Sequence, residues 1–303
     1  MLIFSHSTCL GHAPASDHPE SPERLRVVTE SLHKHFPDLE WREAPRASLP
    51  DLQRVHHPSL IDTILSTDFE GQHWLDPDTL MCTDSPEAAL RAAGAGIAAV
   101  DAVMDGENPI AFCAVRPPGH HATPDAAMGF CLFNNVAIAA AYACTRYGLE
   151  RVTIVDFDVH HGNGTQDIFQ EDGRVKYFST HQAGLYPETG TLYERGVGNI
   201  FNALLPPGSD GFRFRNVWED ALLPEINQFK PQLLMISAGF DAHMHDPMAD
   251  LMLEADDFAW LTRELRKIAD RHSGGRIVST LEGGYDLEAL AECTTAHVGA
   301  LRE

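Results

Sequence analysis

Two aspartates and a histidine alternate between positions 156 and 160, and all three residue types bind metals or carry protons. They are Asp156, Asp158 and His160, and a glycine-rich turn follows from Gly162 to Gly164. An apolar, β-branched run from Val152 to Val155 precedes them and is typical of a buried strand. Residues two apart on a strand point to the same side, so we expect the three side chains to converge. Two buried carboxylates at this separation need a cation to offset their charge, which favours a metal site over a helix cap or an ion-pair cluster.

Polar side chains also follow three other strands that the sequence predicts. They are His120 and His121 after Pro109–Val115, Asp241 after Gln232–Ala238, and Tyr285 after Arg276–Leu281. The carboxyl ends of parallel strands lie along one edge of a sheet, where open α/β sheets bind their ligands. We therefore expect all of these groups to meet in one crevice.

Asp158, His160 and Asp241 could form a three-ligand metal site with coordination positions left for water and substrate, as in catalytic zinc sites. Two oxygens and one nitrogen also suit Fe(II), Mn(II) or Co(II), so the ligand types leave the metal open. Asp241 could instead cap a helix.

Proton-transfer groups accompany this candidate metal site. His120 and His121 could act as base and acid, since imidazole titrates near neutral pH. Asp156 could orient one imidazole, as carboxylates behind a catalytic site do. The Tyr285 hydroxyl could donate to an oxygen that gains negative charge in a tetrahedral transition state. In isolation, the His pair and Tyr285 would more often be ordinary packed side chains, and it is the adjacent candidate metal site that favours a catalytic role.

The composition restricts the class of protein. The chain has 303 residues, 44% hydrophobic and 22% charged, with a net charge of −22. This charge argues against a nucleic acid as partner and would attract a cationic substrate. No apolar run approaches the ~20 residues of a membrane span, and the N-terminus lacks signal-peptide features, so we expect a cytoplasmic protein with no membrane partner. The six cysteines include no C-x-x-C pair and are expected to be reduced and mostly buried. His6, His12 and His18 are expected on the surface.

Strands and helices alternate along the chain. The predicted strands are Leu2–Phe4, Pro109–Val115, Val152–Val155, Val175–His181, Ile200–Leu205, Gln232–Ala238 and Arg276–Leu281. The predicted helices cover Ser21–Phe36, parts of Leu49–Ser66, Ser85–Met104, Asn135–Tyr147, Phe212–Phe229, Glu254–Arg271 and the chain from Leu287. Repeated strand–helix units with nearly continuous apolar strands predict an α/β fold, with helices on both faces of a parallel sheet. The absence of a linker-like segment favours one domain, residues 1–303.

Five ordered motifs resemble the zinc-dependent histone deacetylase superfamily, which includes acetylpolyamine amidohydrolases and acetoin-utilisation proteins. They are RPPGHH (116–121), GFCLFNN (129–135), DFDVHHGNGTQ (156–166), AGFDAH (238–243) and EGGYDL (282–287). The resemblance extends from HPESPERL at His18 to the last helix. It implies an arginase/deacetylase-like single domain, with a central, mostly parallel sheet and helices on both faces.

The resemblance also implies roles for the candidate residues. One zinc ion (Zn²⁺) per subunit would be held by Asp158, His160 and Asp241. His120 would be a buried imidazole backed by Asp156, His121 the general base and acid, and Tyr285 the group that polarises the acetyl carbonyl. Asn163 stands where the class I branch has an Asp beside the second His. Together with Arg116 and Glu282, it favours the class II branch.

Further residues are assigned to substrate and to a second ion by resemblance alone. Gly129, Phe130 and Tyr186 would line a narrow apolar tunnel, although Phe is usual where Tyr186 stands. Asp78 would be a carboxylate at the rim. Met248 occupies the position where polyamine specialists place a Glu. A structural potassium site (K⁺) would involve Asp156, Asp158, His160, Ser179 and Thr180.

The function that these features predict is metal-dependent hydrolysis of an acetylated primary amine, first of all acetyl-lysine in a protein or peptide. An acetylated polyamine is the alternative substrate. An arginase-type ureohydrolase would need two manganese ions and more bridging aspartates, and an inactive acetyl-ligand binding protein would not need the proton-transfer groups. The long N-terminal loop could form a homo-oligomer contact or a pocket wall.

Overall fold

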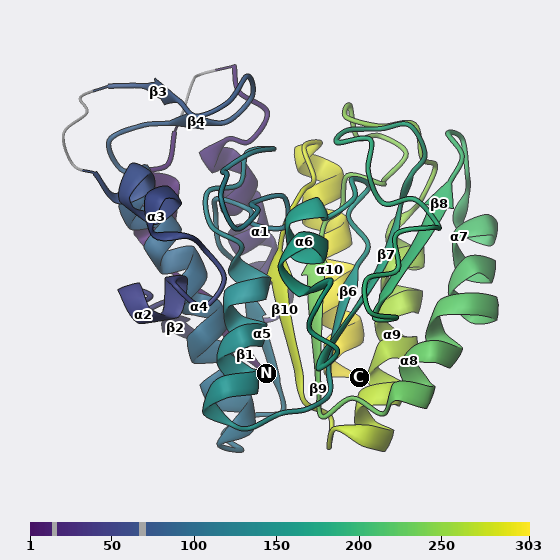
Figure 1. Ribbon diagram of the computed structural model, residues 1–303. Coiled ribbons are helices and arrows are strands. Elements are labelled where there is room, and N and C mark those ends of the chain that lie inside the picture. The colour runs from purple at the N-terminus through teal and green to yellow at the C-terminus, as the bar shows by residue number, and fades with distance from the viewer. Residues whose placement is uncertain (14–16, 67–70) are drawn as a thin grey trace.

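A parallel sheet forms the centre of the molecule (Figure 1). The computed structural model describes residues 1–13, 17–66 and 71–303. In these residues, eight strands pair in the order β2-β1-β5-β10-β9-β6-β7-β8, and each neighbouring pair is parallel. The strands are β1 (Leu2–Ser5), β2 (Glu40–Glu43), β5 (Ile110–Cys113), β6 (Val152–Asp156), β7 (Val175–Gln182), β8 (Ile200–Leu205), β9 (Leu233–Ala238) and β10 (Ile277–Leu281). A short antiparallel pair, β3 (His73–Trp74) and β4 (Leu80–Met81), lies apart from this sheet.

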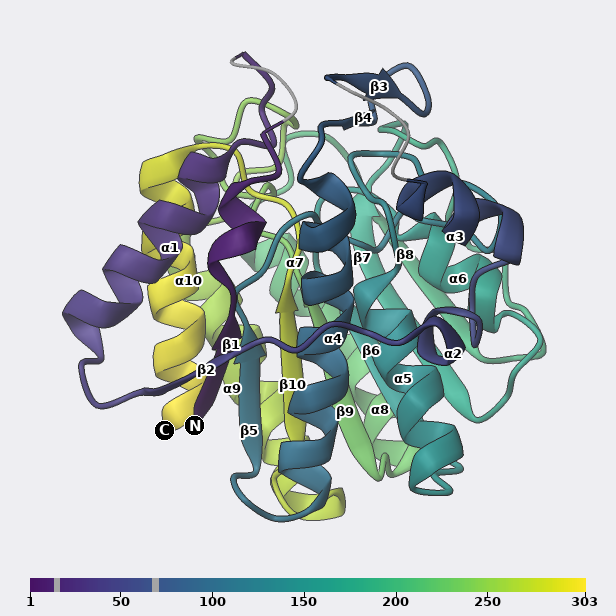
Figure 2. The same ribbon diagram turned by 90° about the vertical axis from the view of Figure 1, so that its left-hand side faces the viewer.

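Helices cover both faces of the sheet, as expected. One face carries α4 and α5, which lie in front of the strands in Figure 2, and the other carries α1, α10 and α9. The helical segments are η1 (Ser7–Leu10), α1 (Pro22–His35), α2 (Leu49–Leu52), α3 (Pro58–Leu65), α4 (Ser85–Met104), α5 (Asn135–Arg146), α6 (Asn163–Phe169), α7 (Gly211–Val217), a π-helical turn (Trp218–Leu222), α8 (Leu223–Phe229), α9 (Ala255–His272) and α10 (Leu287–Arg302). None of these described helices is long and apolar enough to cross a membrane.

The central strands are buried on both faces because both are covered by helices. Every residue of β5, β6, β9 and β10 is buried, which explains their nearly continuous apolar sequences. These four strands are neighbours in the order β5-β10-β9-β6. Their carboxyl ends therefore bring four separate chain segments to one place on the upper edge of the sheet in Figure 1, opposite the two termini.

One expectation about the N-terminal segment is wrong. His12 was expected on the surface, but its side chain is only 2% exposed. It lies against Ser85 at the start of α4, with 2.7 Å between Nδ1 and Oγ. The cysteine expectation is confirmed: all six thiols are free, and five of them are buried.

Candidate active site

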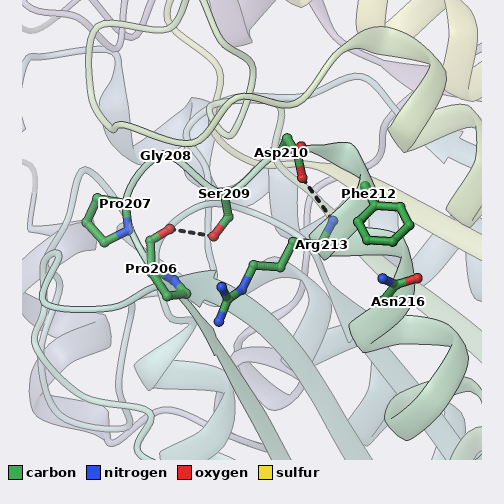
Figure 3. A pocket seen from close by; sticks show the side chains of 8 residues that line it. All are labelled: Pro206, Pro207, Gly208, Ser209, Asp210, Phe212, Arg213 and Asn216. Carbon is green, nitrogen blue, oxygen red and sulfur yellow. Dashed lines mark hydrogen bonds between the residues drawn. The ribbon is translucent and has the colours of Figure 1, made fainter.

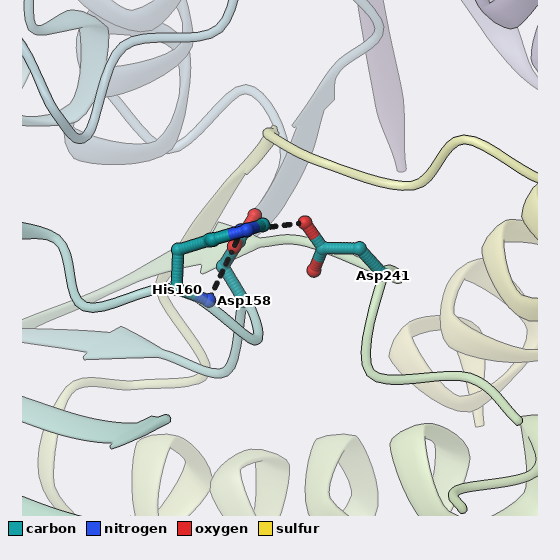
Figure 4. A group of neighbouring side chains, drawn as sticks. All are labelled: Asp158, His160 and Asp241. Atoms are coloured by element: carbon teal, nitrogen blue, oxygen red, sulfur yellow. Dashed lines mark hydrogen bonds and ion pairs between the residues drawn. The ribbon is translucent and has the colours of Figure 1, made fainter. Parts of the chain in front are cut away.

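Asp158, His160 and Asp241 form a buried cluster beyond the ends of β6 and β9 (Figure 4). Their ligand atoms lie within 4.8 Å of one another. The Nδ1 atom of His160 is 3.0 Å from Asp158 Oδ1 and 3.1 Å from Asp241 Oδ2. Strand β6 ends at Asp156, so Asp158 and His160 belong to the turn that follows. For this reason strand alternation does not apply, and Asp156 points to His120 instead of joining the cluster.

Backbone groups hold both carboxylates in place. Asp241 Oδ1 accepts a hydrogen bond from the Val159 N–H at 2.9 Å, and Asp158 Oδ2 accepts one from the Gly283 N–H at 2.9 Å. The chain can approach this closely only without side chains: a Cβ at Gly239 would lie 2.0 Å from Asp158 Oδ2. The turn after β6 and the segments after β9 and β10 are thus packed around the two carboxylates.

The charges of the cluster fit a bound cation. Burial and the neighbouring Asp158 charge raise the pKa of Asp241 to about 7. The pKa of His160 is raised to about 10, since the two carboxylates outweigh the effect of burial. Positive charge is therefore strongly favoured between the carboxylates, where a divalent metal would supply it. Two carboxylate oxygens and one imidazole nitrogen are a donor set that suits catalytic zinc, so these residues fit the ion that the sequence predicted.

His120 lies behind the cluster, between two carboxylates. Its Nδ1 atom is 3.0 Å from Asp156 Oδ2, and its Nε2 atom is 3.8 Å from Asp158 Oδ1. Tyr177 Oη donates to the same Asp156 oxygen at 2.9 Å. Burial opposes protonation of His120, but the Asp158 and Asp156 charges outweigh it and raise its pKa to about 10. His120 is therefore a hydrogen-bond donor fixed by Asp156.

His121 has the opposite electrostatic environment. Its Nδ1–H donates to Asn163 Oδ1 at 2.7 Å, which leaves the lone pair on Nε2. Burial and the positive charges of His120 and His160 hold the pKa of His121 well below its usual value. Its ring centre is 5.8 Å from that of His160. A neutral imidazole beside a metal site is suited to accept a proton there.

Glu282 supports the turn that carries the histidine pair. Its Oε2 atom accepts hydrogen bonds from the backbone N–H groups of Gly119 at 2.7 Å and His120 at 3.1 Å. Burial raises the pKa of this carboxyl to about 7. From sequence, Glu282 indicated only a resemblance to the class II branch. Glu282 is the first residue of the EGGYDL motif, which also contains Tyr285, and this position could have indicated a role at the site.

Two residues that the sequence analysis did not select hold the segment around Tyr285. Asp246 Oδ2 accepts hydrogen bonds from the N–H groups of Tyr285 at 2.6 Å and Asp286 at 3.2 Å. Arg24 donates to the carbonyl oxygens of Gly284 and Glu282, both at 2.5 Å, and its guanidinium lies 4.8 Å from the centre of the Tyr285 ring. No spacing pattern pointed to Asp246, whereas Arg24 belongs to the HPESPERL segment.

Aromatic rings surround the approach to the metal-ligand cluster. The Phe130 ring is 5.9 Å from that of Tyr285, and the Tyr186 ring is 5.2 Å from that of His121. His18 contacts Phe130 edge-on at 4.8 Å. The Tyr186 hydroxyl oxygen is buried without a hydrogen-bond partner. Four aromatic side chains from separate segments are therefore gathered within reach of the cluster.

Two residues that were predicted to contact substrate, Asp78 and Met248, form hydrogen bonds with segments that surround the metal-ligand cluster. Asp78 Oδ1 accepts from the Gly129 N–H at 3.2 Å, so its carboxylate supports the segment of Phe130. The Met248 N–H donates to Asp246 Oδ1 at 3.0 Å, which places Met248 in the loop that supports Tyr285.

Ser179 and Thr180, predicted for potassium, lie on β7 beside β6. Ser179 is the register partner of Asp156, and its Oγ is 2.9 Å from His181 Nδ1. Thr180 Oγ1 is buried without a hydrogen-bond partner.

A surface hollow at the start of α7 lies apart from this chemistry (Figure 3). Two hydrogen bonds join its lining residues, from Ser209 Oγ to the Pro206 carbonyl at 2.6 Å and from the Arg213 N–H to Asp210 Oδ1 at 3.0 Å. Its lining residues contain no pair of converging acid and base groups. We therefore assign the chemistry to the metal-ligand cluster.

Comparisons with known proteins agree with the motifs. The family profile for the histone deacetylase domain matches residues 18–301. The chain belongs to the histone deacetylase family. It is 40% identical to a histone deacetylase-like amidohydrolase of Pseudomonas aeruginosa, over 95% of this chain and 77% of that protein. It is 38% identical to the chloroplastic histone deacetylase 10 of Oryza sativa subsp. japonica, over 96% of this chain and 70% of that protein.

A solved structure shares the fold of this histone deacetylase family member. The crystal structure of the HDA15 HD domain superposes with a TM-score of 0.93 at 33% identity, covering 100% of this chain and 91% of that chain. The expected family and α/β fold are confirmed, and the chain is a deacetylase or amidohydrolase of this family. The buried cluster of Asp158, His160 and Asp241 is consistent with the family's zinc site.

Proposed function

We propose that this protein is a zinc-dependent deacylase that hydrolyses an acetylated primary amine, with acetyl-lysine of a protein or peptide as its first substrate. One zinc ion per subunit would be held by Asp158, His160 and Asp241. The observation that carries the proposal is the neutral His121 beside that cluster, with Nδ1–H held by Asn163 and Nε2 left as an acceptor. A general base is useful here only if a water molecule is to be activated.

The residues divide the reaction between them. Zinc, when bound, polarises the acyl oxygen and makes a water ligand more acidic. His121 accepts a proton at Nε2 from the attacking water, and the water oxygen bonds to the acyl carbon. Tyr285 donates a hydrogen bond to the acyl oxygen as it gains negative charge. The C–N bond then breaks, His121 returns the proton to the leaving amine, and acetate and the free amine are released.

His120 and Asp156 serve this reaction by position and charge. The Asp156 carboxylate orients the His120 ring, and the cationic ring stabilises the negative charge that develops beside it. Glu282 fixes the backbone of the same turn. These residues keep the proton acceptor, His121, at a constant place relative to the cluster.

Residues around the approach set the substrate. Phe130 and Tyr186 would flank an aliphatic chain at the level of Gly129, and Asp78 supports this segment. Met248 offers no carboxylate for a polyamine nitrogen, which favours acetyl-lysine over an acetylated polyamine.

Other parts of the proposal rest on the sequence. They include a potassium ion held by backbone groups of Asp156, Asp158 and His160 together with Ser179 and Thr180. The single domain of residues 1–303, the cytoplasmic location and a homo-oligomer also stay predictions.

Steady-state turnover on three substrates tests the proposal. The zinc-loaded protein is assayed on an acetyl-lysine peptide, N-acetylputrescine and acetylspermidine, with His121→Ala as control. We expect the peptide to have the highest kcat/KM and the control to lose activity. Preference for the polyamines would contradict the substrate assignment. Stoichiometric zinc binding without cleavage of any of the three would contradict the deacylase function.

A further inference from the structure

A second cluster of titratable side chains lies outside the active site, around Cys82. Cys82 follows β4 directly, and it is partly exposed while the other five cysteines are buried. Ser85 and His12 lie against it, and Glu20 lies beyond His12. A thiol, a hydroxyl, an imidazole and a carboxylate thus form one connected chain. The roles proposed for the active site use none of the first three.

The distances define a path for the thiol proton. Ser85 Oγ is 3.3 Å from Cys82 Sγ and 2.7 Å from His12 Nδ1, while His12 Nε2 is 3.4 Å from Glu20 Oε2. With a proton on Nδ1, His12 donates to Ser85 Oγ, and the hydroxyl hydrogen is free to donate to the sulfur. Ser85 Oγ also accepts from the Cys82 N–H at 2.8 Å, so its hydroxyl then has one donor bond and two acceptor bonds. In the thiolate–imidazolium state, Ser85 thus bridges the sulfur and the His12 ring, whose other nitrogen faces the Glu20 carboxylate.

Backbone groups of both kinds face the sulfur. The Gly11 carbonyl oxygen, 3.3 Å from Sγ, accepts from the neutral thiol, while N–H groups favour the negative sulfur. The Ala13 N–H donates to Cys82 Sγ at 3.3 Å, and the sulfur lies just before the N-terminus of α4, where the helix dipole favours an anion. Burial raises the pKa of Cys82, but hydrogen bonds from His12, Ser85 and the N–H groups of Ala13 and Asp84 outweigh it and lower this pKa to about 6.

A buried thiol elsewhere in the chain shows the opposite behaviour. Burial raises the pKa of Cys144 to about 11. Cys82 is thus partly exposed and favoured as the anion, whereas Cys144 is buried and held as the neutral thiol.

We propose that Cys82 is a modification site that reacts with small disulfides and thereby controls access to the active site. Its thiolate attacks one sulfur of the disulfide, a bond forms between Cys82 Sγ and that sulfur, and the second sulfur leaves as a thiolate. An added thiol reverses the exchange by attacking the mixed disulfide. No other oxidant is required, because the small disulfide is itself reduced.

The position of Cys82 connects the adduct to the substrate approach. Asp78 and Thr79 precede β4, and they hold the backbone N–H groups of Gly129 at 3.2 Å and Phe130 at 3.1 Å. A group attached to Cys82 would compete with the hydrogen bonds that the sulfur makes with Ser85, Ala13 and Gly11, and would thereby shift the segment just before it. We infer that the adduct weakens substrate binding at the Phe130 wall. This step depends on the proposed deacylase function.

The rate of mixed-disulfide formation tests the thiolate. The full-length, zinc-loaded protein is treated with bis(2-hydroxyethyl) disulfide, which is neutral at all pH values used, and adducts are counted by intact mass and located by peptide mapping. A thiol with a pKa near 6 is about half ionised at pH 6, whereas an ordinary cysteine is ionised to well under ~1%. After correction for the weaker nucleophilicity of the more acidic thiol, we expect about tenfold faster reaction than for a cysteine peptide at pH 6 and no advantage at pH 8.

Variants assign the effect to the cluster. Cys82→Ser should abolish the single adduct, and the matched Cys144→Ser should leave it unchanged. Ser85→Ala removes the bridge to His12 and should move the midpoint of the rate–pH profile upward, toward that of the peptide. The charged groups of this network are His12 and, beyond it, Glu20, which is paired with Arg24 and Arg116. The Asp84 carboxyl also lies two residues from Cys82. A profile identical to that of the peptide, or an adduct on another cysteine, would overturn the modification site.

A separate measurement tests control of the active site. Modified and thiol-treated samples are compared for turnover of the acetyl-lysine peptide, with Cys82→Ser treated in parallel. We expect KM to rise about threefold or more in the modified protein, to return to its original value after thiol treatment, and to stay constant in Cys82→Ser. Rapid modification with unchanged kinetics would overturn the control of the site. If the unmodified protein cleaves no acyl amine at all, the proposed function has failed, while the mass measurement still decides whether Cys82 is the modification site.

Discussion

Tyr285 and His121 take opposite parts in the proposed reaction, one as hydrogen donor and the other as proton acceptor. Burial raises the pKa of Tyr285 well above its usual value, and the Asp241 and Asp158 charges add to this effect against that of Arg24. The phenol is therefore protonated at neutral pH and can only donate to the developing oxyanion. The pKa of His121 is shifted in the other direction, so neither group depends on pH near neutrality to be in its working form.

Tyr285→Phe removes the donor without touching the metal ligands. We expect kcat to fall by about 10²–10³-fold, the size of effect seen when an oxyanion-hole donor is lost. Zinc content, measured by metal analysis, should remain at one ion per chain. Wild-type turnover in this variant would exclude the oxyanion role.

Tyr186→Phe should have a different outcome. The Tyr186 hydroxyl oxygen is buried and makes no hydrogen bond of ordinary geometry, since the Gly129 N–H that faces it forms only a weak one; a poorly satisfied buried polar atom destabilises the fold. We expect this variant to gain about 1 kcal/mol in the free energy of unfolding, measured by urea titration. The matched control is Tyr177→Phe, which should lose stability because Tyr177 Oη accepts from the Gly162 N–H and donates to Asp156. An equal decrease in the free energy of unfolding of both variants would show that the Tyr186 hydroxyl makes a stabilising hydrogen bond, as the Tyr177 hydroxyl does.

At the residue scale, the sequence motifs predicted the metal ligands and the proton-transfer groups, but not the side chains that hold them in position. The residue types and strand-end positions made Asp158, His160 and Asp241 candidate ligands and left Asp241 open between a ligand and a helix cap. The family resemblance selected the cluster that the structure brings together. Tyr177 and Asp246 escaped notice because their roles depend on contacts between chain segments that no local pattern records. The same limitation applies to His12, whose burial results from contacts with Glu20 and the start of α4.

At the scale of elements, the turn after β6 and the loops after β9 and β10 are shaped around the metal ligands. Gly239 and Gly283 permit this approach, because a Cβ at either position would fall within 2.1 Å of a ligand carboxylate oxygen. At Gly239 a rotamer change of Asp158 alone would not relieve the contact, because the added Cβ would also lie 2.6 Å from Asp158 Cβ. The carboxylate itself would have to move, so the loops and the ligand positions are coupled.

Gly239→Ala tests this coupling. We expect zinc affinity to fall by about 10–100-fold, the range found when support of a metal ligand is lost. Competition with a chromophoric chelator measures the affinity directly. Gly173→Ala is the matched control, since a Cβ there would meet only Val197 Cγ2 at 4.0 Å. Equal zinc affinity in the two variants would show that the loop after β9 can shift to accommodate the added methyl group without moving the ligands.

Asp246 connects the loop after β9 to the segment of Tyr285. Asp246→Ala removes the acceptor for both the Tyr285 and Asp286 N–H groups, and we expect kcat to fall by up to about 10²-fold, because a small displacement of a catalytic group is costly. Asp246→Asn keeps one oxygen that can accept both bonds, so its loss should be much smaller. Steady-state kinetics with the acetyl-lysine peptide would compare kcat of the Ala and Asn variants. A larger loss in the Asn variant would exclude a purely positional role.

Elements with strong apolar patterns were predicted from sequence, and those with weak patterns were not. The seven predicted strands all occur in the sheet, because burial on both faces requires nearly continuous apolar sequences. Strand β2 was missed, since it is an edge strand with the polar sequence EWRE. The helix predicted at Phe212–Phe229 contains a π-helical turn, Trp218–Leu222, just before Pro224, which has no N–H to continue regular bonding.

At the scale of the whole molecule, the active site depends on the strand order. Strands β5, β10, β9 and β6 are neighbours, so the histidine pair, the Tyr285 segment, Asp241 and the Asp158 turn leave the sheet at adjacent positions. No sequence pattern gives this order, because it depends on how the connections cross over the sheet. The parallel direction alone predicted a common edge, and adjacency of the four strands makes that edge a single site.

The same dense packing makes the fold sensitive to acid through buried histidines that are neither metal ligands nor proton-transfer groups. His56 and His297 are 3% and 0% exposed, and burial lowers their pKa values to about 4 and about 3. His297 lies between the hydroxyls of Thr262 and Ser279, at 2.7 and 2.9 Å. The folded state thus keeps both rings neutral, while the unfolded chain binds protons from about pH 6.5 downward.

Stability should therefore decrease as the pH falls from about 6.5 toward 4, because the unfolded state then binds more protons than the folded state. At pH 5 each of the two histidines should lower the free energy of unfolding by about 2 kcal/mol relative to pH 7.5. Urea titrations of His297→Gln and His56→Gln at both pH values test this expectation. Either variant is less stable at pH 7.5 if its hydrogen bonds are lost, but the difference between the two pH values should shrink by about 2 kcal/mol. An unchanged difference would mean that these histidines are already protonated in the fold, and the acid sensitivity would then have to come from other groups, among them His161 and His181, whose pKa values burial lowers to about 3 and about 4.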